Sequence, residues 1–378
     1  MNASNKPPLW LLILLIMFPQ LVETIYSPAL PDISFSFCVS TEQAAQTLSI
    51  YFIAFAAGVT LWGYLSDRIG RRPAILWGLL CYGIGTLMAI ATANFHFLLL
   101  SRVVSAIGAA AGSVVVQAIL RDSYESTALA HVFSVIGTAL ALSPVIGLMS
   151  GGWLVSLWGH MGIFILLLLM AILLFALTLI LLPETRPIDV ALPHIGHLAA
   201  NMLRDSSLWL NALLVALFNA MLFSYYSLAP SLFLQLGWSS KAFGWTGLLL
   251  AFASLISSLL NQRLLASGIY PTRLVQYASI LAVLSGFVAW VLQASSWVLV
   301  PVMGIIVSYG LAIPNVLSQA LWRYREQAGV AGALFGLNYY LMLGLLLGLA
   351  GLVQQLGFVL AVCALIAWAC SLLLKRSQ

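Results

Sequence analysis

Charged residues are scarce in this chain of 378 residues: Asp, Glu, Lys and Arg make up 7% of it, whereas hydrophobic residues make up 62%. Soluble domains carry about 25% charged residues, so the composition excludes a chain of ordinary soluble domains. A helix needs roughly 20 apolar residues to cross a hydrocarbon core of about 30 Å. With short connections, the length therefore suits about twelve membrane spans.

Other absences narrow the class further. The four cysteines show no CxxC or metal-ligand spacing, so they predict neither a disulfide framework nor a metal site. No basic run is interleaved with aromatics, so we expect no nucleic-acid partner. No small-residue cleavage site follows the first apolar run, which predicts a spanning helix rather than a signal peptide. We expect no cofactor.

Twelve apolar segments predict an all-α membrane protein. Strands are excluded because open sheet edges cannot face lipid, and the segments are too long and uniformly apolar for barrel strands. The predicted spans are 9–31, 44–65, 73–93, 96–119, 131–156, 160–182, 207–231, 242–262, 273–293, 296–320, 329–352 and 356–374.

Basic residues predict the orientation. If the N-terminus is cytoplasmic, thirteen of the fifteen Lys and Arg residues lie inside, Lys241 lies outside, and Arg102 falls within a span. This bias follows the positive-inside rule and predicts that both termini are cytoplasmic. The thirteen are Lys6, Arg68, Arg71, Arg72, Arg121, Arg186, Arg204, Arg263, Arg273, Arg323, Arg325, Lys375 and Arg376.

The longest polar connection divides the chain into two sets of six spans. We predict an N-terminal bundle over 1–182, a cytoplasmic linker over 183–206 and a C-terminal bundle over 207–378. The segment Tyr-Ser-Pro-Ala-Leu-Pro from Tyr26 resembles Tyr-Ser-Leu-Ala-Pro from Tyr226, 200 residues later. Six-helix halves related by a parallel repeat are a transporter architecture.

A short charged turn joins the second and third spans: Gly-Tyr-Leu-Ser-Asp-Arg-Ile-Gly-Arg-Arg-Pro from Gly63. It resembles the signature loop of the major facilitator superfamily, and the resemblance implies a conformational hinge. The hinge positions are Gly63, Asp67, Arg68, Gly70, Arg71 and Arg72. A plain positive-inside anchor is the alternative.

Two later segments sharpen the resemblance. Arg121 and Asp122 follow the fourth span, and the fifth ends in a run that contains Pro144, Gly147, Gly151 and Gly152. Both resemble the drug/proton antiporters of the bicyclomycin and chloramphenicol resistance branch, although alanine is more usual there at Ser143 and Gly147. These hinge positions permit a kink and tight packing. The alternative is a bent helix without antiport meaning.

Glu23 and Arg102 are the acid and the base that we place well inside the bilayer, where ionisable groups are costly and usually functional. At 1.5 Å per residue, Glu23 lies ~21 Å and Arg102 ~22 Å from the cytoplasmic edge, so the two can share one depth. The resemblance implies that Arg102 assists proton transfer, although the branch's acid usually occupies the place of Thr24. Asp32, at the outer mouth, is a second candidate proton carrier or a loop acid. A structural Glu23–Arg102 pair or a snorkelling Glu23 is the alternative.

Aromatic and polar side chains complete the expected substrate cavity. Aromatics with few hydrogen-bonding groups suit amphiphilic organic ligands, and helix packing or an interfacial belt is the alternative for each residue. The candidates are Tyr26, Tyr51, Phe52, Gln117, Tyr225, Tyr226, Tyr309, Asn315, Asn338 and Tyr339.

The favoured hypothesis is a monomeric, proton-coupled exporter of small organic compounds in the bacterial inner membrane. Export of an endogenous metabolite such as a siderophore is the alternative, and the fifth-span motif argues against uptake. A membrane-embedded enzyme would need clustered polar residues, whereas the histidines are scattered or in loops. A sensor is a third class, but we expect no appended signalling domain.

Overall fold

The computed structural model describes residues 6–124, 126–186, 201–322, 324 and 328–376, and these are helical with short connections. Most of the predicted linker, 187–200, lies outside the described residues, as do Arg323 and Arg325. The first half contains α1 (Leu9–Tyr26), η2 (Ser27–Ala29), α2 (Leu30–Ser36), α3 (Thr41–Ile69), α4 (Arg71–Ala91), α5 (Phe95–Ser123) and α6 (Ser126–Leu181). The second half contains α8 (Ser206–Gln235), α9 (Ser240–Gly244), α10 (Thr246–Ala266), α11 (Pro271–Leu292), η3 (Ser296–Val298), α12 (Leu299–Ala320), α13 (Ala328–Val353) and α14 (Leu356–Arg376).

Helix α6 contains two membrane crossings. Its backbone leaves helical geometry at Gly159, where φ is +62°. A Cβ built on Gly162 would lie 3.5 Å from the carbonyl oxygen of Leu154, whereas a straight helix separates residues eight apart by about 12 Å. The described part of the chain has eleven helices long and apolar enough to span a membrane. Because the bend divides one of them, the described residues make twelve crossings.

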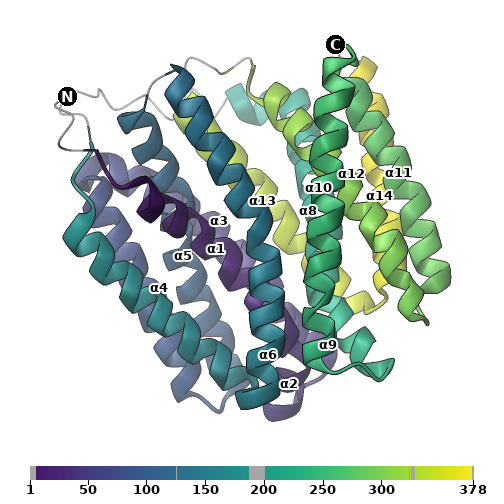
Figure 1. Cartoon of the computed structure of the whole chain (residues 1–378), viewed down its shortest axis with the longest axis horizontal. Coiled ribbons are helices and arrows are strands. Elements are labelled where there is room, and N and C mark those ends of the chain that lie inside the picture. The colour runs from purple at the N-terminus through teal and green to yellow at the C-terminus, as the bar shows by residue number, and fades with distance from the viewer. Residues whose placement is uncertain (1–5, 125, 187–200, 323, 325–327, 377–378) are drawn as a thin grey trace.

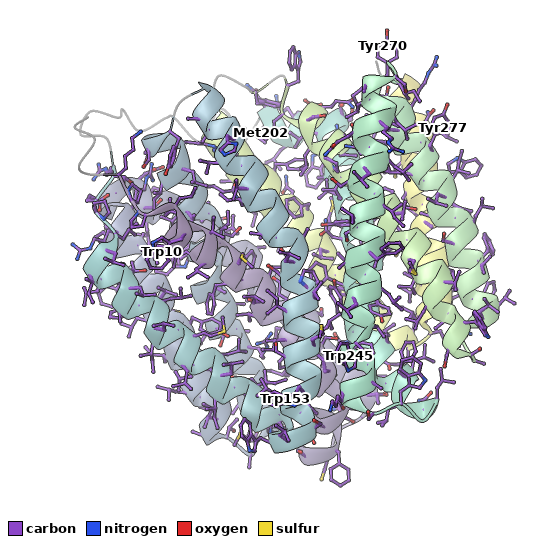
Figure 2. All side chains as sticks on the ribbon, in the orientation of Figure 1. Trp10, Trp153, Met202, Trp245, Tyr270 and Tyr277 are labelled. Carbon is purple, nitrogen blue, oxygen red and sulfur yellow. The ribbon has the colours of Figure 1, made fainter. Side chains whose placement is uncertain are left out.

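The start of α1 and the end of α14 lie at the same end of the molecule (Figure 1), as an even number of crossings requires. We call this end the termini face and the other end the opposite face. Exposed aromatics occur near both: Figure 2 shows Tyr270 at the termini face, and Trp153 and Trp245 toward the opposite face. Tryptophan and tyrosine favour the two membrane–water interfaces, so these positions fit a membrane-spanning bundle.

The helix ends have local chemical causes. Ser40 and Gln43 form a capping box at the start of α3, and the Asn94 side chain accepts backbone N–H groups at the start of α5. Between α3 and α4, Gly70 has φ +104°, a left-handed conformation that glycine adopts without a Cβ penalty. The predicted first span, 9–31, differs from the structure because the α-helix ends at Tyr26 and a 3-10 turn containing Pro28 follows.

The two halves pack mainly through α3 against α13, α6 against α9 and α10, and α2 and η2 against α8. In the first pair, Ser49 Oγ donates a hydrogen bond to the Gly344 carbonyl oxygen at 2.7 Å, and Gln46 Nε2 donates to that of Gly348 at 3.0 Å. Side-chain to main-chain bonds of this kind join helices in lipid, where apolar surface alone gives little attraction.

Candidate functional site

Arg102 of α5 is buried inside the first half, with 1% of its surface exposed. Its guanidinium carbon lies 4.1 Å from the ring centroid of Tyr26 on α1 and 4.4 Å from that of Tyr51 on α3. A cation over an aromatic face in a desolvated site is stabilised by about 2 kcal/mol. Its Nε and Nη2 atoms are buried without a hydrogen-bond partner among the described residues. Arg102 is therefore an enclosed cation with unused donors.

Glu23 of α1 is also buried, and it lies within electrostatic range of Arg102. Among the described residues, however, no ion pair within 4.0 Å joins the two side chains. Thr24, at the position of the branch's usual acid, faces Gly147 of α6 and donates its hydroxyl to the Gln20 carbonyl oxygen. The one-residue shift therefore directs the acid away from α6.

Tyrosines from both halves lie within electrostatic range of Glu23. Its carboxyl group acts electrostatically on Tyr51 of the first half and on four tyrosines of the second: Tyr226, Tyr309, Tyr339 and Tyr340. The ring of Tyr340, which the sequence analysis missed, lies 4.3 Å from that of Tyr339 and 4.9 Å from that of Phe55 between centroids. Its position one residue after the candidate Tyr339 was the available signal.

The other cavity candidates occupy different places. Phe52 packs across the halves, 4.5 Å from Phe223 between ring centroids. Tyr225 instead packs within the second half, where its hydroxyl donates to Thr246 Oγ1 at 2.7 Å. Asn315 is buried and donates to Asn261 Oδ1 at 2.7 Å, whereas Gln117 and Asn338 are half-buried. The structure thus brings Tyr26, Tyr51, Tyr226, Tyr309 and Tyr339 around the Glu23–Arg102 centre.

In the signature loop, Arg71 connects three elements of the first half. Its guanidinium pairs with Asp67 of α3, donates to Asp122 Oδ2 of α5 at 2.8 Å, and donates to Ser66 Oγ at 2.9 Å. The Arg71 side chain is nearly buried, so these charge-assisted bonds satisfy a costly cation. All three contacts lie within the first half, and the conformational hinge that the resemblance implies stays a prediction.

Glu184, at the start of the predicted linker, is a functional candidate that the sequence analysis missed. Its carboxylate accepts the backbone N–H groups of Arg71 and Arg72 at 2.8 and 3.2 Å, and those of Thr185 and Arg186 at 3.0 and 2.9 Å. It therefore caps the N-terminus of α4 from a distant part of the chain, where an anion is favoured by the helix dipole. Its partners lie 112 and 113 residues away, beyond the reach of a local pattern.

The remaining hinge positions fall into two groups. A Cβ on Gly147 or Gly151 would collide with α1 at Thr24 or Ile25, and one on Gly152 would collide with Ser240 of α9. Glycine is therefore required where α6 meets α1 and the second half. Gly63 has ordinary space, with 3.8 Å from a built Cβ to Val114. Arg68 lies over the Tyr64 ring, Arg72 donates to the Leu179 carbonyl oxygen, Arg121 is exposed, and Pro144 lies within α6.

Asp32 has a partner at the opposite face. Its Oδ2 atom accepts the backbone N–H of His160 and contacts Nδ1 of the same residue, both at 2.7 Å. Asp32 belongs to helix α2, whereas the sequence analysis allowed a loop acid. His160 follows the bend at Gly159 and begins the second of the two helical segments of α6, which we call its second arm. No cluster of three His, Cys, Asp or Glu residues suited to a metal ion occurs in the described ranges.

These features define a class: an all-helical, multi-pass membrane protein with a buried acid and a buried base in its first half, within electrostatic range of tyrosines of the second. The chain matches the Major Facilitator Superfamily over residues 12–361 and belongs to that family. It is a secondary transporter and not an enzyme.

Named relatives and a solved structure agree with this assignment. An uncharacterized transporter of Rickettsia felis is 30% identical over 100% of this chain and 99% of its own length. A chloramphenicol resistance protein of Pseudomonas aeruginosa is 28% identical over 86% of this chain and 78% of its own. The crystal structure of a bacterial homolog of the human lysosomal transporter Spinster has a TM-score of 0.76 at 16% identity and covers 98% of this chain and 96% of that one. The last likeness establishes the fold alone.

Proposed function

We propose that the protein exports small organic compounds in exchange for protons across the bacterial inner membrane, as a drug-type antiporter. The observation that carries this proposal is the position of Glu23. This buried acid lies within electrostatic range of the enclosed Arg102, of Tyr51 in the first half and of Tyr226 and Tyr339 in the second. The Glu23 carboxyl group is thus near Arg102, a cation that can favour its ionised form. It is also near the tyrosine rings, which can bind an organic ligand.

The proton and the substrate then compete for Glu23. An ionised carboxylate between aromatic rings attracts a polarised or cationic organic molecule, whereas a protonated carboxyl group does not. Substrate release on one side followed by proton uptake would couple the two flows. The similarity to the chloramphenicol resistance protein supports an organic substrate.

The proposed orientation places the termini face in the cytoplasm. Arg68, Arg71 and Arg72 lie beside the α3–α4 turn, and Arg186 donates to the Arg68 carbonyl oxygen there at 2.7 Å. Basic residues favour the cytoplasmic side of a membrane, which supports this orientation. Export then proceeds from the termini face to the opposite face.

The test is substrate-induced proton release in everted vesicles that contain either the wild type or Glu23→Gln. The amide keeps the size and polarity of the side chain but carries no proton across the pH range of the assay. We expect Glu23→Gln to abolish substrate-induced proton release and to leave part of the substrate binding. The matched control is Glu42→Gln, because Glu42 is an exposed acid in the first turn of α3. Normal proton-coupled export by Glu23→Gln would contradict the proposal.

A further inference from the structure

Asp32 and His160 make two close contacts at the opposite face. One carboxylate oxygen, Asp32 Oδ2, takes both the backbone N–H and the Nδ1 atom of His160 at 2.7 Å. A Cβ on the preceding residue, Gly159, would lie 2.9 Å from that oxygen. The bend in α6 therefore fits closely around the carboxylate of α2.

This pair lies at the boundary between water and the packed interior. The side chain of His160 is 14% exposed and that of Asp32 is 31% exposed. Protons can reach the site, yet its solvent screening is reduced, and buried or partly buried pairs are screened less than exposed ones. A change of charge on His160 therefore changes the strength of its contact with Asp32.

Aromatic contacts connect the pair to the centre of the molecule. The His160 ring lies 6.1 Å from that of Phe164, and Phe164 lies 6.0 Å from Tyr26 between ring centroids. Tyr26 in turn covers Arg102. The residue after it, Ser27, bonds to the Tyr226 carbonyl oxygen of the second half at 2.6 Å. The position of α2 is thus linked to both the charged centre and the contact between the halves.

The same short helix borders a groove between the halves. Pro31, Ser34, Phe35 and Cys38, from α2 and the loop after it, line the groove together with Ser231, Leu234 and Gln235 of α8. Separation of α2 from α8 would widen this groove and open the opposite face. Helix α6 itself packs against α9 and α10 of the second half. A contact that holds α2 onto α6 therefore fixes α2 to the helix that contacts the second half at this groove.

We propose that Asp32 and His160 form a proton-dependent latch that holds the opposite face closed when His160 is protonated. With a neutral imidazole the contact is a hydrogen bond to a carboxylate. One added proton converts it to an imidazolium–carboxylate ion pair, which is the stronger contact. Histidine changes its charge between about pH 5 and pH 8, so a more acidic compartment at this face favours closure. The inference rests on the proposed function only for the direction in which the proton gradient runs.

Other titratable groups near this face do not compete for the pair. Helix α2 packs against α3, α6, α8 and η2, and α6 packs against α9. Helix α6 also packs against α1, α4, α10 and η2. In the described part of the chain, no ion pair joins Asp32 or His160 to another charged group. Cys38 after α2, Glu42 on α3, His96 at the start of α5 and Lys241 on α9 are exposed, whereas Tyr26 of α1 is buried behind Phe164.

The experiment measures the width of the groove directly. Spin labels are placed on the native Cys38 and on Ser231→Cys, with Cys81, Cys363 and Cys370 replaced by serine, in lipid nanodiscs. Double electron–electron resonance then gives the distance distribution at about pH 8 and about pH 5, the range over which histidine titrates. We expect the shorter distance to gain population at low pH, with the closed-to-open ratio rising roughly fivefold or more, as coupling energies of ordinary size produce.

Two conservative variants identify the pair as the cause. Asp32→Asn removes the carboxylate charge and His160→Gln removes the titratable ring, while both retain hydrogen-bonding side chains. We expect each to keep the distribution that the wild type shows at high pH, at both pH values. Glu42→Gln is the matched control and should respond like the wild type. A wild type that does not respond to pH, or a response that survives in both variants, would overturn the latch.

A further variant separates this inference from the proposed function. Glu23→Gln should retain the pH-dependent distances, because Glu23 is not part of the pair. If this variant loses coupled export and the wild-type distances do not change with pH, the latch fails and the antiporter stands. If Glu23→Gln exports normally and the pH response is present, the reverse holds.

Discussion

Ser27 and Tyr226 join the two halves at the point where the sequence repeats. Ser27 Oγ donates a hydrogen bond of 2.6 Å to the carbonyl oxygen of Tyr226, 199 residues later. Both residues belong to the repeated Tyr-Ser segments: Ser27 corresponds to Ser227, and Tyr226 corresponds to Tyr26. The two copies of the segment therefore meet, as expected near the axis that relates parallel repeats.

Ser27→Ala should weaken this contact between the halves. A buried hydrogen bond contributes about 0.5–1.5 kcal/mol, so the variant should shift the closed-to-open ratio of the opposite face by a few-fold toward open. Crosslinking between cysteines introduced at Gln46 and Gly348, which are hydrogen-bonded across the same seam, measures the shift. Ser227→Ala is the matched control, because the Ser227 hydroxyl is buried without a partner among the described residues. Equal crosslinking in the two variants would show that the Ser27 bond does not hold the seam.

Arg102 variants should separate charge from stacking. Arg102→Ala removes the cation between Tyr26 and Tyr51 and should abolish proton-coupled export. Arg102→Lys keeps the charge but loses the planar guanidinium that covers two rings, so we expect partial export. Proton-flux assays in everted vesicles measure both. Full activity of Arg102→Ala would show that the enclosed cation has no part in transport.

Glycine substitutions in α6 should have position-specific effects. Gly152→Ala places a methyl group against Ser240 and 3.1 Å from the Gly244 Cα atom, so α6 and α9 must separate. We expect slowed export and loss of crosslinking between these helices. The matched control on the same helix is Gly137→Ala, where a built Cβ meets nothing within 4 Å. This control should be neutral, or more stable by about 0.5–1 kcal/mol from helix propensity. Similar behaviour of the two variants would contradict the packing role of Gly152.

The signature loop offers a test of the proposed hinge. Asp67→Asn leaves Arg71 with Asp122 as its remaining carboxylate partner, whereas Asp67→Asn with Asp122→Asn leaves a nearly buried cation without either. Coupling energies of about 1–3 kcal/mol would shift a conformational balance roughly five- to 150-fold. We expect the single variant to favour opening of the termini face and the double variant to lower the melting temperature as well. Cysteine crosslinking across that face and thermal denaturation measure the two effects. Unchanged crosslinking and unchanged export in Asp67→Asn would reduce the loop to a topology anchor.

Helices and the family could be predicted from the sequence because lipid leaves few alternatives. An apolar run of about 20 residues must form a helix in a membrane, and the loop from Gly63 to Pro73 is specific enough to indicate a family. The constant rise per residue predicts that Glu23 and Arg102 can share one depth, and this stays a prediction. Depth carries no information about direction around the helix axis, so the tyrosine rings on both sides of Arg102 could not be predicted.

Two further features depend on contacts between distant segments. His160 was discounted because histidines looked scattered along the chain, yet a bend at Gly159 directs it at Asp32, 128 residues earlier. Glu184 looked like part of a polar linker, yet it caps α4. In both cases a carboxylate satisfies backbone N–H groups whose partner is fixed by the tertiary arrangement. Local sequence patterns carry no signal for that pairing.

The bend at Gly159 joins two helical arms of α6 that contact different parts of the molecule. One arm contacts α9 and α10 at the seam, and the other packs against α4, where Leu168 lies 4.0 Å from a Cβ built on Gly83. A single non-helical residue joins the two arms. Because the connection is this short, we expect a movement of the first arm to move the second as well. The second arm presents Leu169, Leu173 and Ile180 outward, with 57%, 58% and 76% of their surfaces exposed. If this arm moves during transport, the lipid against these side chains must move with it, so we expect bilayer thickness to affect the rate of transport.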